Sequence, residues 1–260
     1  MPALPPAAAN HPKPLAMGAA IAALAAIILL APGAGFSLAQ DAPAAGLPPQ
    51  ASARADAQFE GELEVLYEEH EDGARLLHYL HVGNGRRLRL QFEGLAPDLE
   101  TGSRVRARGR LQNEALTVSS NRGVEALAIA SPNTFGSQRV IVILVNFQDN
   151  PSTPYSAASA YTTTFQAASN FYAENSYGQT SLSGDVFGWY TIPMSSTTCD
   201  TNQIAALADQ AAVALGGANL SAYTRKIYGF PKIAACNWWG LGSVGGNPSR
   251  AWINGSYATQ

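Results

Sequence analysis

The stretch VIVILVNF, residues 140–147, decides how the C-terminal half of the chain folds. A strand with one face in water alternates apolar and polar residues, whereas this run is apolar almost throughout. Such a continuous run is typical of a strand that is covered on both faces. We therefore expect residues 131–260 to form a sheet with helices packed against it.

The sequence after this run predicts helix, strand, helix and strand in turn. A helix over residues 156–174 is indicated by an apolar spacing of four, three and four, and residues 182–192 predict a second strand. Asp200 and Gln203 resemble a capping box that begins a second helix, which the pair Gly216-Gly217 ends. The apolar faces of the two helices are Tyr161, Phe165, Ala168 and Tyr172, and Ile204, Leu207, Ala211 and Leu215.

The last part of the chain predicts less regular structure. Residues 226–236 suggest a third strand that Pro231 interrupts, and residues 251–253 a short final strand. Residues 238–248, WWGLGSVGGNP, contain too many glycines for a regular element.

Residues 59–130 alternate with period two, which predicts an antiparallel sheet. Turn residues recur near positions 73, 83–85, 102 and 113. About five strands in about 70 residues fit a small OB-like β-barrel. One strand exposes a stripe of arginines, and we expect it to lie against the acidic face of the first strand as cross-strand ion pairs: Arg104, Arg106, Arg108 and Arg110 opposite Glu60, Glu62 and Glu64. An alternative is single-stranded nucleic-acid binding, but the stripe has no stacking aromatics and the net charge is −3.

The N-terminus predicts export. Lys13 precedes an apolar run from Leu15 to Ala31, and small residues at Ser37 and Ala39 fit a cleavage site. We interpret residues 1–39 as a signal peptide and the Ala- and Pro-rich residues 40–58 as a linker. A retained membrane anchor is the alternative, although the apolar run is short for a span. The protein is expected to be secreted, extracellular or periplasmic, with no stable span once the signal is removed.

The sequence contains two cysteines, Cys199 and Cys236. In an exported protein a lone pair is most simply a disulfide. Two buried thiols are the alternative.

The ordered motifs of the last 120 residues resemble a known family. They include NSYG at 175–178, SGDVFGW at 183–189, CNWWGLG at 236–242 and SRAWING at 249–255. Taken together, residues 138–260 resemble the upstream half of a gametolysin-type peptidase domain, a branch of the metzincin zinc endopeptidases. The resemblance implies an α+β chain in which a metzincin-like mixed α/β peptidase domain, 131–260, follows the β-rich domain as a possible propeptide.

In that family the next element is a helix with two histidines at i and i+4 that bind zinc, and a glutamate that activates the metal-bound water. The four histidines here are His11, His70, His78 and His81, so residues 131–260 contain none. The pair at 78 and 81 would point to opposite faces of a strand and could not share one ion. The sequence therefore predicts no catalytic and no metal-binding residue, a chain truncated before the zinc helix, and no peptide hydrolysis by the chain as given.

The resemblance also implies a peptide-binding edge. In metzincins the substrate, a protein or peptide, adds as a strand to the sheet edge beside the cleft. Its counterpart here is Trp239, Gly240, Leu241 and Gly242, whose glycines would allow close approach of a peptide backbone. The alternatives are a surface loop at this place, and for the whole chain a non-catalytic secreted binding protein that keeps a peptidase-like fold.

Overall fold

Residues 140–147 lie in β7 (Gly136–Phe147), a strand whose last eight residues are all buried, as the continuous apolar run predicts. The structure, a computed structural model, describes residues 56–131 and 133–256. The predicted signal peptide (1–39) and all but the last three residues of the predicted linker (40–58) lie outside the described residues. Strands are the main regular structure of the described chain, and helices are few.

Four strands join β7 in the C-terminal part of the sheet. β8 (Thr180–Ile192) and β9 (Arg225–Phe230) flank β7, and both run parallel to it. β11 (Ser249–Asn254) is parallel to β9, and β10 (Gly240–Ser243) pairs antiparallel with β11. The order is therefore β8-β7-β9-β11-β10.

The prediction of irregular structure over residues 238–248 is wrong, because β10 forms inside it. Glycine weakens an isolated strand, but the ladder is made by main-chain groups that glycine also has. Neighbouring strands on both sides of β10 supply those partners.

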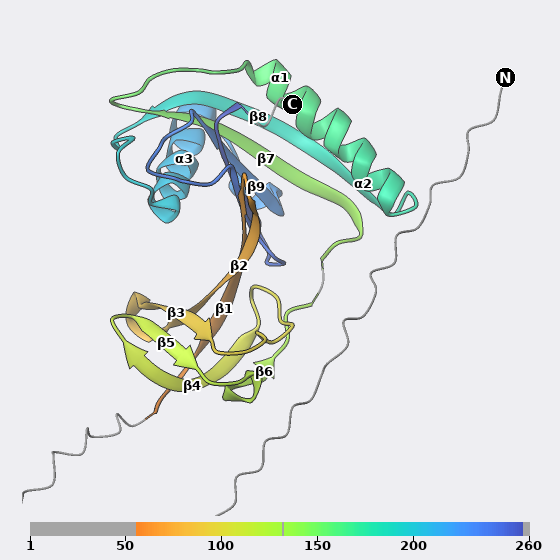
Figure 1. The fold of residues 1–260 in the computed structure, drawn as a ribbon. Helices are drawn as coiled ribbons and strands as arrows, with labels where there is room; N and C mark the ends of the chain where they lie inside the picture. Colours follow the sequence, from red (N-terminus) through yellow and green to blue (C-terminus); the bar gives the residue numbers. More distant parts are fainter. Residues whose placement is uncertain (1–55, 132, 257–260) are drawn as a thin grey trace, which may run out of the picture. The chain divides into compact units, whose positions relative to one another are not determined.

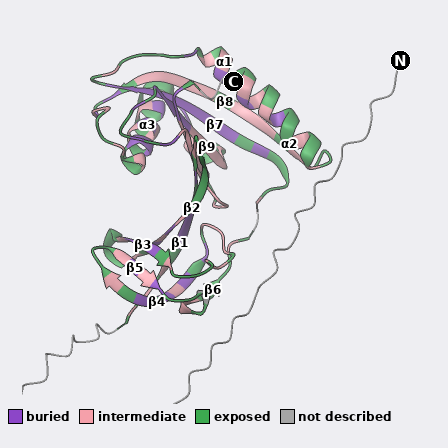
Figure 2. Ribbon diagram, viewed as in Figure 1, coloured by how far each residue is buried: buried purple, intermediate pink, exposed green. Residues whose placement is uncertain are grey.

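Helices cover both faces of this part of the sheet (Figure 1). The segments α1 (Ala157–Thr162), η3 (Thr163–Ala168) and α2 (Ser169–Asn175) follow one another without a break on the face of Val142 and Leu144. α3 (Thr201–Gly216) packs on the opposite face, against Ile141 and Ile143. The two helical layers explain why β7 is apolar on both faces, and Figure 2 shows β7 buried along most of its length.

The first predicted helical face packs on the sheet only in part, because Phe165 contacts the core but the two tyrosines do not. Tyr161 is 45% exposed and Tyr172 49% exposed, whereas the buried residues are Ala160, Thr164 and Ser169. The segment η3 is π-helical, so its turns take up an extra residue and the buried stripe advances by four and then five positions. Small side chains at those positions let the helix approach the sheet closely.

The second helical face is only partly as predicted. Ile204 is buried and Leu207 packs against the core, but Leu215 is 73% exposed, and the buried residues that follow Ile204 are alanines. The ends of the helix are confirmed. The Asp200 carboxylate accepts a hydrogen bond from the Gln203 amide at 3.0 Å, and Gly217 ends the helix with a left-handed φ of 66°.

Residues 57–118 form the predicted antiparallel strands. These strands are β1 (Ala57–His70), β2 (Gly73–Val82), β3 (Arg87–Phe92), β4 (Arg104–Gln112) and β5 (Ala115–Val118). They pair as a ring in the order β1-β2-β3-β5-β4-β1, with one parallel pair, β3 with β5, and β6 (Val124–Ala128) pairs with β4. The alternating apolar residues form the core of the ring: Leu63, Val65, Leu80, Leu88, Leu90, Val105, Ala107, Leu116 and Val118.

The arginine stripe lies against the acidic face of β1 only in part, because Arg108 is opposite Gln58 and Arg110 pairs with Glu93. Glu60 is opposite Arg106 and Glu62 opposite Arg104, and the Arg106 guanidinium contacts the Glu60 carboxylate at 2.7 Å. Glu64 departs from the prediction, because it lies beyond the end of β4 and pairs elsewhere. Among the described residues no helix has the length and hydropathy needed to cross a membrane.

Candidate functional site: a glycine-rich edge strand

The predicted peptide-binding residues lie at and just before β10. Leu241 is opposite Trp252 of β11, and both side chains are buried in the core on the α3 side of the sheet. Gly240 and Gly242 alternate with Leu241 and so point to the other face. A Cβ atom added at Gly240 would meet only Glu69 Oε2 at 3.7 Å and a main-chain oxygen at 3.9 Å. This face of β10 therefore has little covering it at Gly240.

The fully buried side chain of Asn254 holds the loop that leads into β10 through hydrogen bonds. The Asn254 side-chain amide donates to the carbonyl oxygens of Cys236 and Trp238, both at 2.8 Å, and of Ile233 at 3.3 Å. Its carbonyl oxygen accepts from the Ile233 amide at 2.8 Å. One side chain thus satisfies four main-chain groups of this loop through buried hydrogen bonds, which fixes where β10 begins.

The predicted disulfide is confirmed. Cys199 and Cys236 are joined, with Cα atoms 5.1 Å apart, and neither cysteine is free. The bond ties the same loop to the N-terminus of α3. The Trp252 indole strengthens this junction by donating to the Thr201 carbonyl oxygen at 2.9 Å.

The outer edge of β10 is paired with β1. Residues Leu66–Glu69 of β1 run antiparallel to residues Gly240–Ser243. Main-chain hydrogen bonds extend the ladder at both ends: the Val244 amide donates to the Val65 carbonyl oxygen, and the Trp239 amide to the Glu69 carbonyl oxygen, both at 2.9 Å. The stretch predicted to bind a peptide strand therefore already has a strand beside it.

A buried carboxylate ties the same region of β1 to β11. The Glu64 side chain is 5% exposed and contacts the guanidinium groups of Arg87 and Arg250, each at 2.8 Å. The His81 ring nitrogen Nε2 lies 2.9 Å from the same carboxylate. Three basic side chains from three strands thus converge on one acid.

The pKa of Glu64 records this environment. Burial alone raises the pKa, because it disfavours the charged form. The hydrogen bond with His81 and the charges of Arg87, His81 and Arg250 outweigh burial and lower the pKa from 4.5 to about 2. Glu64 is therefore ionised at neutral pH, and its charge is neutralised locally.

A cavity of about 690 Å³ lies beside Glu64. Asp209 of α3 lines it and is paired within the chain, because it accepts hydrogen bonds from the Lys226 ammonium at 2.6 Å and from the Tyr228 hydroxyl at 3.1 Å. The charged groups that line this cavity mostly pair with one another. Such an arrangement is more typical of a structural joint than of a catalytic centre.

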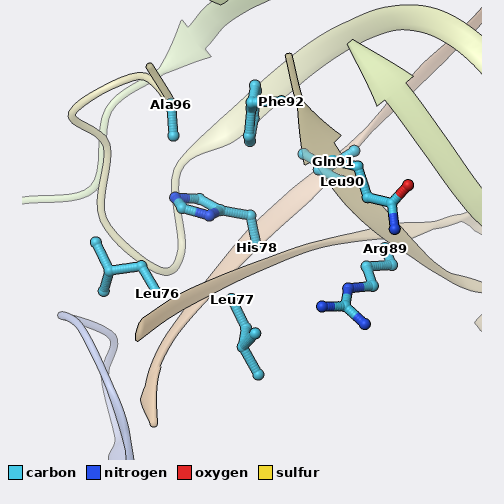
Figure 3. A pocket seen from close by; sticks show the side chains of 8 residues that line it. All are labelled: Leu76, Leu77, His78, Arg89, Leu90, Gln91, Phe92 and Ala96. Carbon is cyan, nitrogen blue, oxygen red and sulfur yellow. The ribbon is translucent and has the colours of Figure 1, made fainter. Parts of the chain in front are cut away.

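The described histidines lie apart from the glycine-rich edge, with one exception. His78 faces a pocket of about 380 Å³ beside Phe92 and Ala96, while Leu77 and Arg89 point away from it (Figure 3). Burial lowers the pKa of His78, because it disfavours the charged form of the ring. His81 bonds Glu64, so the 78 and 81 pair is divided between two faces, as expected for a strand. The exception is His70, whose Nδ1 lies 3.0 Å from the Asn237 carbonyl oxygen, just before β10.

The residues present do not fit a zinc site. Residues 131–260 contain no histidine, and both cysteines of the chain are in the disulfide. No group of three His, Cys, Asp or Glu side chains close enough to hold a metal ion occurs in 56–131 or 133–256. A zinc-dependent reaction would need ligands other than these.

Sequence reasoning missed Asn254 and the role of Glu64. Asn254 lies within the motif SRAWING, which indicates the family resemblance. The motif gives no sign that the Asn254 side chain bonds four main-chain groups of a loop. Glu64 looks like the third member of an acidic stripe, and only its position past the end of β4 makes it different. No local pattern could have identified Arg250, 186 positions away, as its partner.

One comparison with known proteins gives a match. The family model described as Gametolysin peptidase M11 matches residues 155–260. The match supports a gametolysin-type peptidase family, and it lies within the 138–260 region of the sequence resemblance. It includes β10, β11 and the disulfide, but not β7 or the β1–β6 strands. No curated protein matches the chain.

Proposed function

We propose that this chain is the upstream part of a secreted, zinc-dependent metalloendopeptidase of the gametolysin type. The observation that carries the proposal is the family match over residues 155–260, which includes the β10–β11 edge. A peptidase family implies a protein or peptide substrate. The proposed reaction is hydrolysis of a peptide bond.

The strand arrangement supports a metzincin-like assignment for residues 131–260. This part of the sheet has four parallel strands, in the order β8, β7, β9 and β11. The antiparallel strand β10 follows them, next to β11. Here β1 pairs with the outer side of β10, so β10 would offer a peptide the main-chain partners that strand addition requires only once β1 is displaced. The ring of β1–β5 supports the further proposal that residues 59–130 form an OB-like barrel that acts as a propeptide.

The proposed substrate-binding residues are Trp239, Gly240, Leu241 and Gly242. In this assignment the main chain of β10 fixes the direction of the substrate strand, and Gly240 and Gly242, which carry no side chain, leave room on one face for the side chains of that strand. Leu241 holds the edge in place through its contact with the core.

Zinc would supply the activated water, through a helix with HExxH spacing. The residues described here do not provide that helix. We propose that its histidines belong to sequence downstream of position 260. The contribution of this chain would be to bind and orient the substrate strand.

Secretion is supported by the disulfide, since structural disulfides persist in oxidising compartments. The proposed signal peptide, residues 1–39, accounts for export of the chain. Its removal is tested by N-terminal sequencing of the secreted protein, which should begin after Ala39.

The central experiment is expression of the reading frame extended downstream of codon 260. We expect the extension to encode HExxH, and the purified product to bind one zinc ion per chain and to cleave casein. Substitution of the HExxH glutamate should abolish cleavage but leave zinc bound. An extension without that motif, or a zinc-loaded product that leaves casein intact, would contradict the proposal.

A further inference from the structure

Strand β1 belongs to two different pairings along its length. Its first part, residues 57–62, pairs with β4 and closes the ring of β1–β5. Its last part, residues 66–69, pairs with β10 instead. The ring domain therefore inserts the end of one of its own strands beside the glycine-rich edge.

Hydrogen bonds show which main-chain groups of β1 face β10. The carbonyl oxygens of Val65 and Glu69 accept from the amides of Val244 and Trp239. Earlier on the same side of β1, the Leu63 amide donates to the Ser103 carbonyl oxygen. Alternate residues of a strand direct their main-chain groups to the same side. Tyr67, which is opposite Gly242, therefore presents its amide and carbonyl to β10 as a bound peptide would.

Side chains fasten both ends of this segment. Before it, Glu64 contacts Arg250 at 2.8 Å. After it, His70 Nδ1 lies 3.0 Å from the Asn237 carbonyl oxygen. The segment between them, residues 65–69, is thus held in register on β10 by contacts outside the ladder.

We propose that residues 65–69 of β1 are a built-in competitor that keeps the substrate-binding edge of β10 closed to other peptides while the N-terminal ring remains attached. The proposal rests on the proposed function, because it takes β10 to be the edge that binds substrate. The two strands compete for the same main-chain groups. The side of β10 away from β11 has one set of amide and carbonyl groups, so β1 and a substrate strand cannot pair with it at the same time.

Attachment makes the competition strong. A strand tethered by a short connection acts at an effective concentration of about 1 mM, and such linkage changes apparent affinity by roughly 100-fold or more. The connection from β6 to β7 spans positions 129–135, where Ile129 is 71% and Phe135 69% exposed. A cut in this connection turns β1 from a tethered competitor into a separable one.

The test measures peptide binding to the full chain before and after β1 is released. A specific protease recognition sequence is inserted after Ser131, and the chain is studied uncut and cut. Fluorescence anisotropy reports binding of two labelled probes: a synthetic copy of residues 63–70, and β-casein. Hydrogen exchange reports protection of the β10 amides, so that release of β1 is observed independently of binding.

A point substitution releases β1 without a cut. Tyr67→Pro removes the amide that faces β10, while the neighbouring residues keep the amides that face β2. The matched control is Leu76→Pro, directly opposite on β2. The Leu76 amide points away from β1. The residues of β2 that pair with β3 are His78–His81, so Leu76 lies outside that ladder as well. Loss of the Leu76 amide therefore removes no hydrogen bond between β1 and β10.

We expect both probes to bind about 100-fold more tightly to the cut chain and to Tyr67→Pro than to the uncut chain or Leu76→Pro, together with loss of β10 protection. Equal binding of casein to all four proteins would overturn the proposal and leave the proposed peptidase function standing. Binding of the residue 63–70 copy alone would show that the edge is a joint specific to β1. That result would overturn the proposal and also count against β10 as the substrate site. Should Tyr67→Pro not fold, the cut chain provides the same comparison.

Discussion

Replacing Glu64 by glutamine tests whether the buried carboxylate holds the ring of β1–β5 to the C-terminal sheet. The substitution keeps the size of the side chain and removes its charge. Arg87 and Arg250 then lose the anion that neutralises both of them, while their own side chains remain only about 30% exposed.

The size of the effect follows from the pKa of Glu64. One pKa unit is worth about 1.4 kcal/mol of interaction with the charged form. Lowering the pKa from 4.5 to about 2 therefore corresponds to about 3 kcal/mol of stability at neutral pH. This agrees with the roughly 3–5 kcal/mol that removal of one partner of a buried ion pair costs.

The pH dependence has a definite sign. Because the pKa of Glu64 is lower in the folded protein, its contribution is complete above pH 4.5 and is lost as the pH falls through about 2. Urea unfolding of the wild type and Glu64→Gln should differ by about 3 kcal/mol at pH 7. The difference should shrink steadily between pH 5 and pH 2.

Glu93→Gln is the matched control. Glu93 pairs with Arg110 at 2.9 Å, but both side chains are about half exposed, and surface pairs contribute less than about 1 kcal/mol. Two results would refute the reasoning: a loss below about 1 kcal/mol for Glu64→Gln, or a difference from the wild type that does not change with pH.

Two further substitutions test the support of the glycine-rich edge. Asn254→Leu leaves buried main-chain groups of the loop before β10 without hydrogen-bond partners. We therefore expect the free energy of unfolding, measured in urea, to fall by about 3 kcal/mol. The control Asn170→Leu, at an exposed site of α2, should change it little. Cys199→Ser combined with Cys236→Ser opens a loop of sequence separation 37, and we expect about 3–4 kcal/mol of lost stability in thermal unfolding. An unchanged melting temperature of the double variant would show that the disulfide adds nothing to the folded state.

Much of the fold could be predicted because its signals are local. The continuous apolar run 140–147 predicts a strand covered on both faces, and its two sets of side chains do face different helices. The alternation in residues 59–118 predicts the strands of the ring and their buried faces. Asp200 and Gly217 mark the ends of α3 because capping depends on adjacent main-chain groups.

The errors lie where packing overrides local pattern. The aromatic residues Tyr161 and Tyr172 predict an apolar face, but the π-helical turns of η3 bring Ala160, Thr164 and Ser169 to the sheet instead. The glycines of residues 238–248 predict a loop, but neighbouring strands on both sides make β10 a strand. In the second case one of the two neighbours, β1, is far away in sequence.

The candidate site divides in the same way. The sequence alone determined its residue types: two glycines alternating with Leu241, a lone pair of cysteines, and no histidine in residues 131–260. Only the tertiary structure decided what lies beside them. The pairing of β1 with β10, and of Glu64 with Arg250, joins positions more than 170 residues apart. Such contacts depend on where whole strands come to lie, since hydrogen bonds and ion pairs act over a few ångströms in space and leave no periodic trace in the sequence.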